Sequence, residues 1–271
     1  MAEAERGAVR VALVTGAARG IGAATVHGLV VAGWSVVAVD RGADDPRLPY
    51  PLGSEAELEA TVRSAERVGP GEAVARVADT TDPVALGAAV ADAEARFGGL
   101  DAVLAVAGVI AGGVPLWEMP EEQLRVVVEV DLLGPVVAAR VGIPALLRRP
   151  APRDGRFIAV ASAAATRGLP GLAAYGAAKA GVAGLVRGLA ADLRGTGVTA
   201  TGVSPGSTAT AMLDESARLY GLDGRQAFAA QQPVERLLDP AEVAAALVWL
   251  AGPDSSAVTG AVIPVDGGLA L

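Results

Sequence analysis

The amino-acid sequence predicts a doubly wound α/β fold, in which helices cover both faces of a parallel sheet. Short runs of β-branched residues alternate with Ala- and Leu-rich helical stretches along the whole chain. Several of the short runs are apolar at consecutive positions, as expected for strands that are covered on both faces. Because strand–helix alternation with right-handed crossovers builds a parallel sheet, these two observations define the fold class.

The pattern also places the individual elements. Strands are expected at residues 10–14, 35–39, 73–77, 102–106, 156–161, 198–203 and 261–265. Helices are expected at residues 21–32, 54–68, 83–97, 121–147, 175–195 and 241–251. No repeat and no internal boundary divides the sheet, so residues 1–271 are expected to form a single domain.

Two segments interrupt this alternation. Residues 41–53 are rich in Pro and Asp, and residues 207–236 form a long connection with amphipathic pieces at 211–220 and 225–231. Long connections in a compact domain are usually functional or disordered. Both segments are therefore candidates for a functional role.

Composition and charge exclude several classes of protein. At 52% hydrophobic residues the chain can bury a large core, yet no apolar run approaches the roughly 20 residues that cross a bilayer. Residues 1–10 are charged and lack the apolar stretch of a signal peptide, so we expect a cytoplasmic protein without a membrane partner. The net charge of −8 argues against nucleic acid as a partner, because such proteins normally present a basic face.

Rare residue types narrow the chemistry further. The chain has no cysteine, which excludes disulfides and thiol chemistry, and its one histidine, His27, cannot build a His/Cys metal site. We therefore expect no metal. Lys179 is the one lysine among 22 lysine and arginine residues. Lysine offers a compact ammonium where arginine brings a broad planar fork, so the position of Lys179 is informative.

A glycine-rich turn, T-G-A-A-R-G-I-G at residues 15–22, lies between the first expected strand and the first helix. Gly16, Gly20 and Gly22 permit a tight turn and let the backbone approach a pyrophosphate. The helix N-terminus offers free N–H groups and the positive end of its dipole to that anion. A plain strand–helix turn is the alternative, but the strand before and the helix after favour a dinucleotide site.

The second expected strand ends in Asp40, 18 residues beyond Gly22. An acidic side chain there accepts both ribose hydroxyls of the adenosine and repels a 2′-phosphate, which favours NAD over NADP. Arg19 and Arg41 lie nearby in the sequence and could hold a phosphate instead. The plainer interpretation of Asp40 is a turn residue.

The ends of the third and fourth strands supply further candidates. Asp79 and Thr80 end the third strand, where a carboxylate could bind the adenine amino group. Ala107 and Gly108 follow the fourth strand, where small residues let the backbone flank a cofactor.

The catalytic candidates are a Tyr–Lys pair and a serine. Tyr175 and Lys179 open a helix in the sequence Y-G-A-A-K, and their spacing of four puts them on one helix face. An ammonium near a phenol lowers the pKa of the phenol from about 10 towards a value useful for proton transfer. Ser162, at the end of the fifth strand, is placed to hold a substrate oxygen.

These motifs resemble the single-domain branch of the short-chain dehydrogenase/reductase family over essentially the whole chain. The glycine turn, Ser162, the Y-x-x-x-K pair and P-G-S-T-A-T at residues 205–210 all match. The resemblance implies a seven-stranded Rossmann sheet, a homodimer or homotetramer, and a nicotinamide amide held near Thr208 with Thr210 beside the diphosphate. The cofactor-binding residues then expected are Gly16, Arg19, Gly20, Ile21, Gly22, Asp40, Arg41, Asp79, Thr80, Ala107, Gly108, Tyr175, Lys179, Pro205, Gly206, Thr208 and Thr210.

Within that family the sequence looks like the mycofactocin-associated members. Residues 41–53, A-G-V-I-A-G-G at 107–113 and P-L-W-E at 115–118 carry this resemblance. It implies an insertion near the adenine site that holds NAD so tightly that the redox partner, mycofactocin, re-oxidises it in place. Residues 207–236 would then form the substrate lid.

Two positions depart from the family pattern. The family's Asn-Asn-Ala-Gly is A-V-A-G at residues 105–108, which removes a side chain that braces the sheet. The family's catalytic Asn corresponds to Asp131, whose extra carboxylate near Lys179 would alter the electrostatics there. Asp131 is therefore a catalytic candidate of a different kind from Ser162, Tyr175 and Lys179.

The sequence favours an oxidoreductase that interconverts a secondary alcohol and a carbonyl by hydride transfer, with Tyr175 as acid/base. A catalytically silent NAD-binding sensor or scaffold is the alternative, although such a protein needs no Ser/Tyr/Lys set. An epimerase or dehydratase is disfavoured, because sugar-modifying relatives generally carry a separate substrate domain. A small apolar alcohol or ketone is suggested by Val109, Ile110, Leu169, Met212, Leu213, Leu219 and Phe228.

Overall fold

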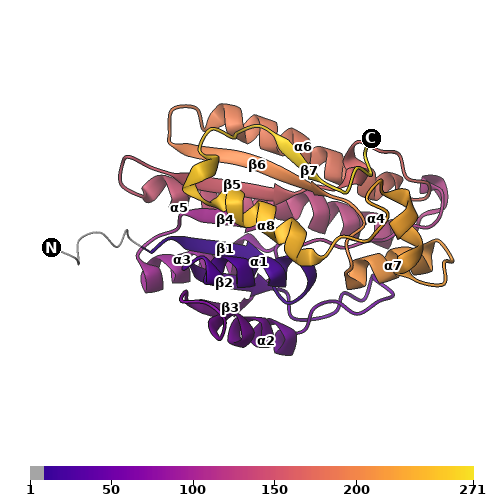
Figure 1. Cartoon of the computed structure of the whole chain (residues 1–271), viewed down its shortest axis with the longest axis horizontal. Coiled ribbons are helices and arrows are strands. Elements are labelled where there is room, and N and C mark those ends of the chain that lie inside the picture. Colours follow the sequence, from indigo (N-terminus) through magenta and orange to yellow (C-terminus); the bar gives the residue numbers. More distant parts are fainter. Residues whose placement is uncertain (1–8) are drawn as a thin grey trace.

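The computed structural model describes residues 9–271 and has a seven-stranded parallel sheet at its centre (Figure 1). The strand order is β3-β2-β1-β4-β5-β6-β7, so the order reverses direction between β1 and β4. All six pairings are parallel, which confirms the predicted doubly wound sheet. The strands are β1 (Val11–Thr15), β2 (Ser35–Asp40), β3 (Ala73–Val77), β4 (Ala102–Ala105), β5 (Gly155–Val160), β6 (Val198–Pro205) and β7 (Val262–Val265).

Helices cover both faces of the sheet and enclose two apolar cores. One face is covered by α1 (Gly20–Val31), α2 (Glu55–Glu66) and α8 (Pro240–Ala251). The other face is covered by α3 (Pro83–Phe97), α5 (Gly134–Arg148) and α6 (Ala173–Asp192). The inner strands β1, β4 and β5 are buried at every position, as their continuous apolar runs predicted.

Short polar signals fix where helices begin. Ser54 and Glu57 form a capping box at the start of α2, and Asp239 and Glu242 form another at α8. In each box the first side chain accepts a hydrogen bond from the helix backbone while the glutamate bonds back to the cap residue, which satisfies otherwise free N–H groups.

The helix expected over residues 121–147 is interrupted. It consists of α4 (Glu121–Val128), a π-helical turn (Glu129–Leu133) and α5. Pro135 has no N–H and cannot make the α-helical bond to the carbonyl of Asp131, four residues earlier. Directly before this proline, the N–H of Gly134 bonds to the carbonyl of Glu129, five residues earlier, which is the hydrogen bond of a π helix. Such π turns are frequent at functional sites, and this one carries Asp131.

The carboxyl ends of the strands lie on the right in Figure 1, together with α4 and α7. The long connection after β6 contains α7 (Ala211–Leu219) and a 3₁₀ helix (Arg225–Gln231), where the sequence showed amphipathic pieces. Further 3₁₀ turns are Leu116–Glu118, Ala163–Ala165 and Pro253–Ser255.

The expectation that the chain has no signal peptide concerns residues 1–10, and residues 1–8 lie outside the described residues. Within residues 9–271, none of the helices combines the length and the hydropathy that crossing a bilayer requires.

Candidate active site

Two adjacent cavities lie at the carboxyl ends of the strands, where open parallel sheets bind their ligands. The first has a volume of about 420 Å³ and the second of about 460 Å³. All predicted site residues except Asp131 line one or both of them. The residues that line both cavities, and therefore mark where they meet, are Ile21, Val106, Gly108, Thr210 and Met212.

The glycine turn forms one wall of the first cavity. Gly16 and Gly20 have φ angles of +69° and +58°, in the left-handed region that favours glycine. A Cβ on Gly16 would lie 2.7 Å from the Cα of Ala107, and a Cβ on Gly22 would lie 1.9 Å from the carbonyl oxygen of Gly16. The close packing of this turn against the end of β4 therefore requires glycine.

The N-terminus of α1 meets the same cavity at Gly20 and Ile21. Arg19 precedes the helix in an extended conformation, and no side chain caps the helix. The first turn also holds no acidic residue. The helix end is therefore available to an anion, through its N–H groups and the positive end of its dipole.

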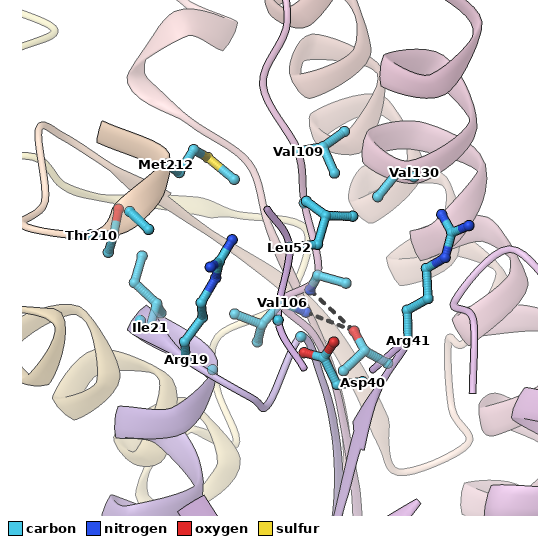
Figure 2. A pocket seen from close by; sticks show the side chains of 18 of the residues that line it. Arg19, Ile21, Asp40, Arg41, Leu52, Val106, Val109, Val130, Thr210 and Met212 are labelled. Carbon is cyan, nitrogen blue, oxygen red and sulfur yellow. Dashed lines mark hydrogen bonds between the residues drawn. The ribbon is translucent and has the colours of Figure 1, made fainter. Parts of the chain in front are cut away.

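Asp40 ends β2 and lines the first cavity, as labelled in Figure 2. Its Oδ2 accepts a hydrogen bond from the N–H of Ala18 (3.0 Å), and its Oδ1 accepts one from the N–H of Gly42 (3.3 Å). These bonds hold the carboxylate at the cavity wall, where it can accept hydrogen bonds from ribose hydroxyls and repel a 2′-phosphate.

The two arginines on either side of this carboxylate in Figure 2 are engaged by the protein itself. Arg19 Nη2 donates to the carbonyl of Pro51 (2.6 Å). Arg41 Nη1 donates to Asp45 Oδ2 (2.5 Å), and Arg41 Nε lies 3.6 Å from Asp79 Oδ2. Because two carboxylates offset the charge of Arg41, its guanidinium is a poor partner for a 2′-phosphate.

Residues 41–53 pack into the first cavity. Asp45 is 2% exposed and accepts hydrogen bonds from the backbone N–H and the side chain of Arg47. Tyr50 and Leu52 line the cavity. Leu48 does not line it and is buried in an apolar cluster with Tyr50 and Leu52 at its edge. The sequence did not identify Asp45, since nothing in an Asp-rich loop tells which carboxylate is buried.

The ends of β3 and β4 complete this cavity. Asp79 Oδ1 accepts hydrogen bonds from the N–H and the hydroxyl of Thr81 (2.8 and 2.7 Å). Thr80 Oγ1 is buried and has no hydrogen-bond partner among residues 9–271. Ala107 and Gly108 line the wall next to them. A polar ligand in this cavity would supply the partner that Thr80 lacks.

Ser162, Tyr175 and Lys179 meet at the wall of the second cavity. Ser162 follows β5, whereas Tyr175 and Lys179 lie one turn apart in α6, which begins at Ala173. Lys179 Nζ lies 5.7 Å from the centroid of the Tyr175 ring and donates to the carbonyl of Val160 (3.2 Å). The structure thus brings together the three side chains that the sequence singled out.

Asp131 lines neither cavity. Its Oδ1 lies 3.0 Å from Lys179 Nζ and accepts a hydrogen bond from the N–H of Val109 (3.2 Å). Its Oδ2 is buried without a hydrogen-bond partner in the described part of the chain. A Cβ on Gly108 would lie 2.8 Å from Asp131 Oδ1. Asp131 therefore contacts Lys179 directly but does not lie on the wall of either cavity.

Burial and neighbouring charges set the pKa values of this cluster. Burial raises the pKa of Tyr175, Lys179 lowers it, Asp131 raises it and a hydrogen bond with Ser162 lowers it, with a net rise. Burial opposes the charge of Lys179, but Asp131 and Tyr175 outweigh it and raise the pKa of Lys179. Burial also raises the pKa of Asp131, against the attraction of Lys179. The buried pair therefore titrates as a unit.

The second cavity is mainly apolar. Five of the seven apolar residues that the sequence suggested line it, while Val109 lines the first cavity and Leu219 lines neither. Among its lining residues in the described chain, Lys179 is the only charged side chain. The five are Ile110, Leu169, Met212, Leu213 and Phe228.

The loop after β6 joins the two cavities. Pro205, Gly206 and Thr208 line the second cavity, and Thr210 lines both. Thr210 also caps α7, since its side chain accepts a hydrogen bond from the N–H of Leu213 (3.4 Å).

Sequence reasoning missed two residues that hold the site together. Thr15 Oγ1 accepts hydrogen bonds from the N–H groups of Val106 (3.1 Å) and Ala107 (3.2 Å), so it braces β1 against the end of β4. Gln232 Oε1 accepts a hydrogen bond from the N–H of Ser207 (2.8 Å) and fixes the loop after β6. Thr15 is the first residue of the glycine-rich turn, which was a usable signal, whereas no feature of the sequence marked Gln232.

The residues of the first cavity fit a nicotinamide dinucleotide. Backbone occupies the space where side chains on Gly16 and Gly22 would lie, the N-terminus of α1 is uncapped, and Asp40 presents a carboxylate. The buried hydroxyl of Thr80 is left to pair with a ligand. The two cavities meet at Gly108, where a Cβ would lie 3.3 Å from Lys179 Nζ, so the catalytic cluster adjoins the cavity that fits the dinucleotide.

Comparisons with known proteins agree with this geometry. A family model described as enoyl-(acyl carrier protein) reductase matches residues 16–270. The chain is 38% identical over 265 residues to cis-4-hydroxycyclohexanecarboxylate dehydrogenase of Sinomonas cyclohexanicum, with 96% of each chain covered. It is 33% identical over 273 residues to (−)-trans-carveol dehydrogenase of Rhodococcus erythropolis, covering 97% of this chain and 98% of the other.

Solved structures show the same similarity. Carveol dehydrogenase from Mycobacterium avium in complex with NAD superimposes with a TM-score of 0.90 at 29% identity, covering 97% of this chain and 98% of that one. A short chain dehydrogenase from Mycobacterium paratuberculosis bound to NAD gives a TM-score of 0.86 at 31% identity, covering 97% and 99%.

Proposed function

The chain belongs to the short-chain dehydrogenase/reductase family, and from that premise we propose that it is an NAD-dependent enzyme that interconverts a secondary alcohol and a ketone. The observation that carries this proposal is the meeting of Ser162, Tyr175 and Lys179 beside a cavity that fits a dinucleotide. NAD, when bound, supplies the carbon that takes up or releases the hydride.

The chain's own residues handle the proton and the substrate oxygen. Ser162 would donate a hydrogen bond to that oxygen, and Tyr175 would take the alcohol proton, or return it in the reverse direction. Lys179 stabilises the phenolate of Tyr175 through its positive charge, and it would also hold the nicotinamide ribose. Asp131 keeps the ammonium of Lys179 charged and in place.

We infer a small, neutral and apolar substrate. The second cavity has the hydroxyls of Ser162 and Tyr175 on its wall, and its other lining residues are mainly apolar, with neutral polar side chains such as Ser216, Tyr220 and Gln231 among them. Lys179 is the one charged group among its described lining residues. Burying a substrate carboxylate without a cation of its own would be costly. Residues 207–236, which include Met212, Leu213 and Phe228 of the lining, are proposed as the substrate lid.

We further propose that residues 41–53 retain the dinucleotide, so that mycofactocin re-oxidises the NADH formed on alcohol oxidation in place. Tyr50 and Leu52 line the cofactor cavity, and the bond from Arg19 to Pro51 closes the segment against the glycine turn. The prolines at 46, 49 and 51 reduce the entropy that ordering this segment costs.

Purification without added nucleotide tests both parts of this function. Mass spectrometry and the ultraviolet spectrum would report co-purified NAD, and addition of carveol or cyclohexanol should produce bound NADH in a single turnover. Exchange with labelled NAD should be slow in the parent and fast after residues 43–52 are replaced by a short Gly/Ser link. Exchange within seconds in both proteins would contradict retention but not the dehydrogenase activity.

The proposed assembly follows from the family resemblance, and the proposed location follows from the composition of the sequence. We propose a single-domain subunit in a cytoplasmic homodimer or homotetramer. Light scattering coupled to size exclusion measures the assembly directly.

A further inference from the structure

We propose that residues 41–53 position the catalytic lysine from a distance, with Arg47 and Tyr50 as positioning residues for the Asp131–Lys179 pair. Residues 41–53 would then hold Asp131 and Lys179 in place, in addition to lining the cofactor cavity. This inference rests on the proposed role of Lys179 in proton transfer.

The first contact reaches the π turn that carries Asp131. Arg47 Nη1 lies 2.6 Å from Glu129 Oε2, and Glu129 is the first residue of that turn, two positions before Asp131. A π turn departs from regular α-helical hydrogen bonding, so its side-chain directions depend on outside contacts more than those of an unbroken helix do. The Arg47–Glu129 ion pair supplies such a contact.

The second contact reaches the backbone that binds Asp131. Tyr50 Oη accepts a hydrogen bond from the N–H of Ile110 (2.8 Å). The preceding N–H, that of Val109, donates to Asp131 Oδ1. Tyr50 therefore fixes the peptide next to the one that holds the carboxylate, and Ile110 also lines the substrate cavity.

The segment itself is held firmly enough to act as a brace. Asp45 is buried and joins Arg41 to Arg47, with Arg47 Nη2 at 2.8 Å from its Oδ2. Asp44 Oδ1 accepts a hydrogen bond from the N–H of Leu52 (2.7 Å). These bonds fix both ends of the stretch that carries Arg47 and Tyr50.

The Asp131–Lys179 ion pair depends on how firmly the Asp131 side chain is held. Neither Asp131 nor Lys179 has a side chain more than 3% exposed, and a buried pair is favourable only when its geometry is good. The groups facing Lys179 Nζ are Asp131, the Tyr175 ring and the carbonyl of Val160. A shift of the Asp131 carboxylate therefore changes the charge balance at the proton-transfer site.

The pKa of Lys179 can be measured directly and without substrate, because Lys179 is the one lysine of the chain. Protein carrying lysine labelled with ¹³C at Cε should show one such signal, because the chain has only Lys179. The pH dependence of its shift reports the pKa of the Lys179 ammonium. Asp131→Asn serves as the reference variant, since it removes the negative charge that faces Lys179.

We expect Tyr50→Phe, Arg47→Gln and Glu129→Gln each to lower the pKa of Lys179, by roughly half a unit to one unit, because each loosens the placement of Asp131. Asp131→Asn should lower it further. In the double variant, Glu129→Gln should add nothing to the effect of Arg47→Gln, since its contact with Arg47 is already lost, whereas Arg47→Gln also removes bonds to Asp45 and its effect is not reduced to the Glu129 contact alone. The ascending limb of the single-turnover rate of carveol oxidation against pH should move to lower pH by a similar amount.

Arg125→Gln is the matched control. Arg125 lies one helical turn before Glu129 and pairs with Glu121 on the exposed face of α4, and within residues 9–271 its side chain makes no hydrogen bond or ion pair with residues 41–53. An unchanged pKa of Lys179 in Tyr50→Phe, Arg47→Gln and Glu129→Gln, with folding verified by circular dichroism, would overturn the inference. Failure of the parent to oxidise any alcohol would instead contradict the proposed function and leave this titration interpretable.

Discussion

The Nζ atom of Lys179 and the Oδ1 atom of Asp131 lie 3.0 Å apart, and the two side chains are only 3% and 0% exposed. The family's usual Asn carries no charge, so this pair places an extra negative charge next to the Tyr175–Lys179 couple. Its consequence is electrostatic. Asp131 raises both the pKa of Lys179 and the pKa of Tyr175.

Asp131→Asn should therefore move the pH dependence of alcohol oxidation to lower pH, by about one unit or more. Oxidation needs Tyr175 deprotonated, and removing a negative charge makes proton release from the Tyr175–Lys179 couple easier, whichever group releases it. The ascending limb of the single-turnover rate against pH measures this shift. An unchanged midpoint, with Glu121→Gln as a surface control, would contradict the electrostatic role of Asp131.

Lys179→Arg should slow turnover by roughly 10²-fold, on the scale of one positioned acid/base interaction. The guanidinium keeps the charge but is too broad for a pocket bounded by Asp131, Gly108 and the Val160 carbonyl. The rate of carveol oxidation at saturating NAD checks this expectation. Near-normal rates would show that the lysine has no special role.

Asp40→Asn should narrow the preference for NAD over NADP, because it removes the charge that repels a 2′-phosphate and keeps one oxygen, which can still accept the shorter hydrogen bond from the N–H of Ala18. Calorimetric affinities of the two dinucleotides for nucleotide-free protein measure the ratio. Asp254→Asn, on the exposed turn after α8, is the control. Equal affinities in the parent would show that Arg19 and Arg41 dominate after all.

Asp45→Asn should lower the free energy of unfolding at neutral pH by about 2 kcal/mol, as for hydrogen bonds to charged groups. Hydrogen bonds from Arg47 hold the pKa of Asp45 well below its usual range, although burial opposes them. A depressed folded-state pKa gives stability that is present above the unfolded pKa of about 3.9 and lost as the pH falls through the folded value.

The difference between Asp45→Asn and the parent should therefore shrink as the pH drops below about 4. Urea unfolding at several pH values measures it, with Glu59→Gln as the control, because Glu59 pairs with Arg63 on the surface. If the difference in the free energy of unfolding between Asp45→Asn and the parent stays constant down to low pH, the ionised carboxylate of Asp45 is not the source of the stabilisation.

Local sequence signals predicted most of this fold. The continuous apolar runs of β1 and β4 and the glycine turn needed only their immediate neighbours to be interpreted. Tyr175 and Lys179 were identified for the same reason, since a spacing of four defines a helix face by itself.

Contacts between distant segments could not be predicted in this way. The pairing of Arg47 with Glu129 joins residues 82 positions apart, and no local pattern shows which of several carboxylates an arginine will meet. The π turn at Asp131 likewise depends on Pro135 and on packing that apolar periodicity does not encode. The sequence predicts that the carboxylate of Asp131 alters the electrostatics near Lys179, but it does not predict the direct ion pair between the two side chains.

The most direct test of the whole account is Tyr175→Phe, because the proposed reaction moves its proton through that phenol. The variant should keep NAD occupancy and circular dichroism close to the parent, since the ring that packs above Lys179 is retained. Formation of bound NADH after addition of carveol or cyclohexanol, followed in a single turnover, should fall below a few per cent of the parent rate. A variant that oxidises the same alcohol at a rate comparable to the parent would remove Tyr175 from the mechanism and contradict the account.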